Sequence, residues 1–280
     1  MNEDLRPKPT ELLPVTQQLL RSVEGRTGRP VVIRPDPSIR ERGRAVYVVS
    51  DPDPNRHLIL YDPERRRFLD HLVAHEAGHI LHFHEAPEAE RRLPVVTHES
   101  RRQGVLDLAP HALQLSAIGA DDWTTAKMVD LWISGTVAQL SDTPSDIRIE
   151  RWIWEEHPGL RNVQRRALRD QSHELSEALR PTVEAITPRQ VWLASNAMNY
   201  ALLKSVSELI GDPNLVRPYR STAPEGWGKR LLASVDFGPN ASLMTDRRTT
   251  EHWAETMGFA RWFEWRHLTH LPADQQHGVE

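Results

Sequence analysis

The pattern of apolar and polar positions in the first 85 residues predicts two helices separated by three strands. A helical face of apolar residues runs over residues 9–25 and closes at a glycine. Three short apolar runs, over residues 30–34, 44–49 and 57–61, predict strands bounded by turns rich in Pro and Asp. Pro63 then suits the first turn of a helix with Asp62 as its N-cap, and apolar positions over residues 68–83 recur at helical spacing. The segment therefore predicts an α-β-β-β-α module.

The remainder of the chain predicts mainly helices. Helical patterns cover residues 103–140, a segment that begins at Pro144 with Asp142 or Thr143 as its cap, and residues 162–179, 188–210 and 249–268. Residues 211–248 are rich in Gly, Pro, Ser and Asn and predict an extended loop. We therefore expect an α+β protein with a small three-stranded sheet, divided into a domain over residues 1–157 and a helical part over residues 158–280 that packs on it.

Composition narrows the possible function. The chain has 280 residues, a net charge of -4 and no cysteine, which excludes disulfides and thiolate ligands and argues against a nucleic-acid partner. No apolar run approaches the roughly 20 residues that a membrane span needs, and the N-terminal residues lack the apolar core of a secretory signal. We therefore expect a cytoplasmic protein with neither a membrane nor a nucleic acid as its partner.

The candidate chemistry lies in residues 71–84. His75, Glu76 and His79 form the spacing H-E-x-x-H. Residues four apart share one face of a helix, so both imidazoles can bind one metal ion. Glu76 can then act as general base on a water bound to that ion. The sequence therefore predicts a Zn²⁺ site, and His71, one turn before His75 on the same face, could line the same cleft.

The stretch Val73–Leu81 resembles the active-site helix of zincin metallopeptidases. The predicted order of one helix, three strands and this helix is similar to the minimal gluzincin-like domains, including those of the ImmA/IrrE type. The resemblance implies a zinc-dependent peptidase whose sheet supports the active-site helix and whose peptide or protein substrate pairs with an edge strand. Gly78 lies inside this helix, where glycine costs roughly 1 kcal/mol relative to alanine, and so indicates a packing or functional reason.

A catalytic zinc ion usually takes three protein ligands, and without cysteine the third must be His, Asp or Glu. Asp146 and Glu150 are four apart and would share a helix face, so one could bind zinc while the other orients a ligand histidine. Gluzincins have such a pair with the glutamate first, and here the order is reversed. We take Glu150 as the third ligand and keep Asp146 as the alternative ligand or supporting carboxylate. Glu99, twenty residues after His79, is the remaining candidate.

Three functions are compatible with this site. The first is a zinc metallopeptidase in which Glu76 activates a metal-bound water. The second is a regulatory protein of the ImmA/IrrE type, which cleaves or binds one specific partner through its helical second half. The third is a non-catalytic module in which any metal is structural. The intact glutamate of the motif favours the first.

Overall fold

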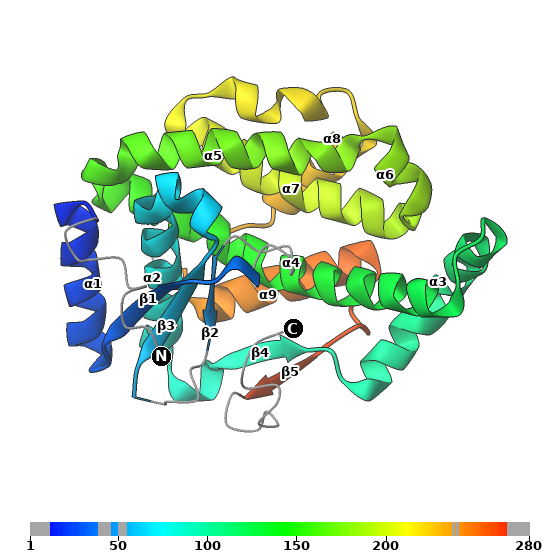
Figure 1. The fold of residues 1–280 in the computed structure, drawn as a ribbon, viewed down its shortest axis with the longest axis horizontal. Helices are drawn as coiled ribbons and strands as arrows, with labels where there is room; N and C mark the ends of the chain where they lie inside the picture. Colours follow the sequence, from blue (N-terminus) through cyan, green and yellow to red (C-terminus); the bar gives the residue numbers. More distant parts are fainter. Residues whose placement is uncertain (1–11, 39–45, 50–54, 237, 239–240, 268–280) are drawn as a thin grey trace. The chain divides into compact units, whose positions relative to one another are not determined.

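The computed structural model describes residues 12–38, 46–49, 55–236, 238 and 241–267 (Figure 1). Helices hold most of these residues and two small sheets hold a few, which is compatible with the predicted α+β class. The described residues divide into two compact units. The first comprises those up to Arg91 together with Arg148–Arg169, and the second comprises Arg92–Ile147 and Asp170–His267. This division differs from the predicted boundary at residue 157, because helix α4 supplies residues to both units.

The first unit contains the predicted α-β-β-β-α order. Its elements are α1 (Pro14–Thr27), β1 (Val31–Pro35), β2 (Val46–Val49), β3 (His57–Tyr61), the 3-10 segments η4 (Pro63–Phe68), η5 (Glu88–Glu90) and η6 (Pro158–Leu160), α2 (Leu69–Glu85), the end of α4 (Asp122–Glu156) and the start of α5 (Arg161–Ser176). The strands lie in the order β1-β3-β2, with β1 parallel and β2 antiparallel to β3. The predicted positions 9–11, 44–45 and 50–54 lie outside the described residues.

Helix α2 packs against the sheet and α4 and is hydrogen-bonded to α1. Ile33 and Ile59 of the sheet belong to one buried cluster with Val73 of α2 and Ile153 of α4. Asp70, in the first turn of α2, accepts the backbone N–H of residue 13 at 2.7 Å and the hydroxyl of residue 16 at 2.6 Å. It thereby caps α1, whose own N-cap side chain makes no capping hydrogen bond. The helix that carries the motif is therefore anchored in the core of its unit.

Two local expectations meet different outcomes in this unit. Asp62 caps as predicted, because its side chain accepts the N–H of Glu64 at 2.9 Å, but the turn that it starts is the 3-10 segment η4. The prediction that α1 ends at Gly25 is wrong. The helix continues to Thr27, and Gly28, with φ 68°, ends it in the left-handed conformation that glycine adopts without strain.

The second unit is mainly helical. Its elements are β4 (Arg92–Val95), α3 (His98–Ala117), most of α4, η7 (Glu177–Leu179), α6 (Pro181–Ile186), α7 (Arg189–Ile210), η8 (Pro213–Tyr219), α8 (Ala223–Leu232), α9 (Leu243–Met257) and β5 (Glu264–His267). Strands β4 and β5 pair antiparallel. Among the described residues, no helix combines the length and the apolar character needed to cross a membrane.

The predicted helix start at Pro144 is wrong, because α4 runs through this proline without a break. A proline inside a helix removes the N–H that the carbonyl four residues earlier would accept. That carbonyl belongs to Leu140, and the hydroxyl of Thr250 donates to it at 3.0 Å in a buried contact. The orphaned acceptor is thus satisfied by a side chain 110 residues away, which a local sequence pattern does not reveal.

Two further expectations in this unit are wrong. Residues 211–248 do not form one extended loop, since η8 and α8 lie inside this range and Thr222 caps α8 by accepting the N–H of Glu225. The terminal helix does not reach residue 268. It ends at Met257, followed by Gly258 with φ 83°, and the chain then forms β5. Gly258 is the stop signal in the sequence that marks this end.

Candidate metal centre

The motif residues lie on α2 in the positions that helical spacing predicts. Glu76 is buried at 7% exposure, while the side chain of His75 is 19% exposed. His79 is also partly exposed. Within the described part of the chain, no hydrogen bond or ion pair holds the Glu76 carboxylate. The arrangement leaves two imidazoles at the edge of the core with a carboxylate between them in sequence.

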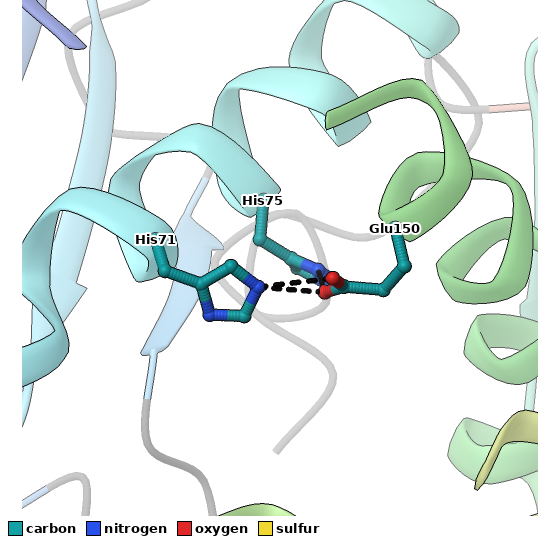
Figure 2. A group of neighbouring side chains, drawn as sticks. All are labelled: His71, His75 and Glu150. Atoms are coloured by element: carbon teal, nitrogen blue, oxygen red, sulfur yellow. Dashed lines mark hydrogen bonds and ion pairs between the residues drawn. The ribbon is translucent and has the colours of Figure 1, made fainter. Parts of the chain in front are cut away.

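The two nitrogens of the His75 ring have different environments. Its Nδ1 lies 2.8 Å from Oε1 of Glu150 on α4 (Figure 2). An ionised carboxylate only accepts hydrogen bonds, so Nδ1 carries a proton, and in the neutral ring Nε2 then presents its lone pair. That Nε2 lies 3.2 Å from Nε2 of His79. The second nitrogen of His75 therefore faces the other histidine of the motif.

The separation between the two Nε2 atoms fits a shared metal ion. Two nitrogens about 2.05 Å from a zinc ion, at the tetrahedral angle, lie about 3.3 Å apart. The observed 3.2 Å between His75 and His79 is close to this value. The donor set, two imidazoles with a carboxylate behind one of them, is also found in zinc sites of proteins.

Glu150 is buried at 3% exposure and is surrounded by donors. Nε2 of His71 lies 2.9 and 3.0 Å from its two oxygens, and Nε2 of Gln164 donates to Oε2 at 2.7 Å. Figure 2 shows His71 and His75, on successive turns of α2, both directed at this carboxylate. Burial by itself would raise the pKa of Glu150, but the electrostatic interactions and hydrogen bonds with His71 and His75 hold that pKa well below its usual range.

One nitrogen of His71, one nitrogen of His75 and one oxygen of Glu150 lie within 4.8 Å of one another, so these three residues form a second group that could hold a metal ion. The N···O distances of 2.8–3.0 Å are those of hydrogen bonds between a ring N–H and a carboxylate. Both oxygens of Glu150 already accept N–H groups. The geometry of this group is therefore that of a carboxylate which supports the ring of His75.

The other candidate ligands have distinct settings. Asp146 is half-buried and, because α4 is continuous, lies one turn before Glu150 on the same helix. Glu99 is exposed on α3 and accepts two hydrogen bonds from Arg102, at 2.6 and 3.0 Å. The side-chain hydrogen bond from Arg102 lowers the pKa of Glu99. Among the described residues, Glu99 belongs to no group of side chains that could hold a metal.

A second histidine contact follows the motif on α2. Nη2 of Arg148 lies 2.7 Å from Nε2 of His82, three residues after His79. A guanidinium only donates, so Nε2 of His82 accepts and the ring is neutral. Burial, followed by the charge of Arg148, lowers the pKa of His82 to about 3. This residue is therefore a neutral neighbour of the motif at ordinary pH.

The sequence gives no signal for Gln164 and only a weak one for His71, although both contact Glu150. The sequence does not single out Gln164, because a glutamine on an amphipathic helix has no distinguishing spacing, yet this residue is fully buried and donates to both Oε2 and the backbone carbonyl of Glu150. His71 was marked only by its position one turn before His75. The signal that favours it is the recurrence of His71, His75 and His79 at intervals of four.

Scans against protein-family models, curated proteins and solved structures found no match for this chain. The functional conclusion therefore depends on the geometry and chemistry of the residues described above.

Proposed function

We propose that the protein is a zinc-dependent hydrolase that cleaves peptide bonds, with His75 and His79 as zinc ligands and Glu76 as general base. One observation carries this proposal. The Nε2 atoms of His75 and His79 lie 3.2 Å apart while Nδ1 of His75 is hydrogen-bonded to a buried carboxylate. This combination places one ring nitrogen of each histidine close to the other and favours the tautomer of His75 that leaves Nε2 free for a metal ion, which supports a zinc site.

We assign the third ligand to Asp146 and give Glu150 the supporting role. Glu150 accepts N–H groups from three side chains, one of them from His75, and this leaves its oxygens directed at donors. Asp146 is the carboxylate one helical turn earlier on α4 and is half-buried. The sequence predicts Glu150 as the ligand and Asp146 as the alternative ligand or supporting carboxylate. The proposal exchanges these two roles, so that Asp146 binds the metal and Glu150 orients a histidine.

The proposed mechanism assigns a proton transfer to Glu76. A bound zinc ion would lower the pKa of a water molecule and polarise the scissile carbonyl. Glu76 takes a proton from that water as it attacks the carbonyl carbon, and it then gives the proton to the leaving amine as the C–N bond breaks. Glu150 accepts the Nδ1–H of His75 throughout and keeps that ring in one tautomer. The low exposure of Glu76 is consistent with proton transfer away from bulk water.

The scaffold also supports a zincin-like first unit. One helix precedes the strands β1, β2 and β3, and α2 follows them and packs on the core that includes residues of the sheet. We propose that this three-stranded sheet and α2 form a zincin-type domain of the gluzincin-like kind. In such a domain a substrate in extended conformation would pair with an edge strand.

Replacement of Glu76 tests the mechanism. Glu76→Gln should retain zinc, measured by elemental analysis of purified protein, and should lose hydrolysis of a quenched fluorescent peptide library by at least about 100-fold, since general acid–base catalysis contributes roughly 10²–10⁴. Glu88→Gln, an exposed glutamate in η5, is the matched control and should leave both unchanged. Hydrolysis at the wild-type rate by Glu76→Gln would refute the assigned base.

A dedicated protein partner is the second candidate function. Large apolar side chains are exposed on the second unit, among them Leu113 of α3 and Trp123 of α4, at 73% and 70% exposure. These two residues flank the turn between α3 and α4, and exposed apolar side chains that gather on one surface often mark protein interaction sites. Co-purification with Glu76→Gln followed by mass spectrometry should then yield one partner that the wild-type protein cleaves. Unfolding on chelation, without hydrolysis of any peptide, would instead favour the non-catalytic module.

A further inference from the structure

His71 is a buried histidine that the proposed hydrolysis does not use. Its side chain is 6% exposed, and it lies one turn before His75 on α2. Burial of a polar ring without a hydrogen bond is unfavourable, because the ring loses its bonds to water. The contact that offsets this cost is made by Nε2, which lies 2.9 and 3.0 Å from the two oxygens of Glu150.

The other ring nitrogen of His71, Nδ1, makes no comparable contact with any residue that the structure describes. Nδ1 is buried, and among the described residues it has no hydrogen-bond partner. Since Glu150 can only accept, Nε2 of His71 donates. The buried ring therefore leaves one nitrogen without a hydrogen bond to the described part of the chain. Its other nitrogen is hydrogen-bonded to the carboxylate of Glu150, which also accepts a hydrogen bond from His75.

Gln164 holds the same carboxylate from a second helix. Its Nε2 lies 2.7 Å from Oε2 of Glu150 and 2.8 Å from the backbone carbonyl of the same residue. Oε1 of Glu150 remains directed at Nδ1 of His75, at 2.8 Å. Donors from α2 and α5 thus fix the plane of a carboxylate that extends from α4.

We propose that His71 is a positioning residue, which together with Gln164 orients Glu150 so that His75 is held in its Nδ1–H tautomer before metal binds. The inference rests on the proposed zinc site, since it assigns the purpose of that tautomer. Residues that hydrogen-bond to metal ligands typically change metal affinity by 10–100-fold when they are replaced. His71 acts one step further away, through Glu150, and its removal should give the lower part of that range.

Two substitutions of His71 separate positioning from packing. His71→Leu removes the N–H donor, whereas His71→Gln retains an amide N–H that can occupy the position of Nε2. Both are measured in metal-free protein by ¹⁵N NMR of the histidine rings, which reports the tautomer of His75, and by the affinity for Co²⁺ in competition with a chelating dye. His84→Leu, at the end of the same helix, is the control.

We expect His71→Leu to weaken Co²⁺ binding by roughly 10-fold and to give a mixture of His75 tautomers. His71→Gln should recover most of both properties, and His84→Leu should match the wild-type protein. If His71→Leu does not fold, Gln164→Met supplies the same test from the other helix. A single Nδ1–H tautomer in His71→Leu or Gln164→Met, with unchanged Co²⁺ affinity, would overturn the inference and leave the proposed function intact. Failure of the wild-type protein to bind Co²⁺ would overturn the proposed function itself, and the NMR measurement would still test the orientation of His75.

Discussion

Exchanging Glu150 for glutamine should separate a supporting carboxylate from a zinc ligand. Glu150→Gln preserves shape but replaces one acceptor oxygen by an NH₂ group. Three N–H donors, from His71, His75 and Gln164, converge on that carboxylate, so at least one of them must then face another donor. A buried donor without a partner costs about 1–3 kcal/mol, and the remaining bonds lose their charge assistance. We expect the free energy of unfolding to fall by about 3 kcal/mol.

The same variant should lose stability but keep most of its capacity to bind zinc. As a support for His75, Glu150 should contribute about 10–100-fold to affinity, so Glu150→Gln should still take up one equivalent of zinc at high concentration. Asp146→Asn should show the opposite pattern, with little change in urea unfolding because the side chain is half-buried, and loss of stoichiometric zinc. Glu99→Gln, an exposed carboxylate paired with an arginine, should change neither quantity.

Elemental analysis after dialysis, together with urea unfolding of each variant, provides the measurement. The reasoning is refuted if Glu150→Gln contains no zinc while Asp146→Asn retains a full equivalent, because Glu150 would then be the ligand that the sequence first suggested. Loss of zinc in Glu99→Gln would refute it in a second way. It would show that an exposed residue of α3 completes the site.

Three further outcomes test particular contacts. Gly78→Ala should destabilise the protein by about 1–3 kcal/mol in urea, because the added Cβ would lie 2.7 Å from a methyl carbon of Ile149; an unchanged midpoint would contradict this. Burial lowers the pKa of His82 to about 3 from 6.5, so the unfolded chain binds more protons below pH 6.5. The free energy of unfolding should therefore fall by up to ~1.4 kcal/mol per pH unit towards pH 3, and His82→Gln should lack that slope. Thr250→Val should cost about 1–3 kcal/mol in thermal unfolding by orphaning the carbonyl of Leu140, and full stability would show that this carbonyl finds another donor.

The elements of the first unit could be predicted because their signals are local. Alternating or helical apolar spacing marks β1, β3 and α2, and Asp62 caps the turn before α2 as its residue type predicts. The glycine at position 78 also indicated a packing constraint. The structure supplies that constraint, since Ile149 and Trp152 of α4 approach it too closely for a side chain.

The remaining features depend on residues distant in sequence. Pro144 has the local signature of a helix start, and only the hydroxyl of Thr250 explains why α4 continues through it. The roles proposed for Asp146 and Glu150 cannot be assigned from the sequence either, because both are acidic and share a helix face. What distinguishes them is the nitrogen of His75 that Glu150 reaches, which depends on the packing of α2 against α4.

That packing links the fold of the first unit to its chemistry. Gly78 is one residue before His79, and Ile149, which contacts it, is one residue before Glu150. A larger residue at position 78 would separate the two helices at the point where Glu150 must come within 2.8 Å of His75. Hydrogen bonds to an ionised carboxylate weaken steeply with distance and misalignment. The absence of a single side chain on α2 therefore permits both the close packing of the two helices and the hydrogen bond that would orient His75 in the proposed metal site.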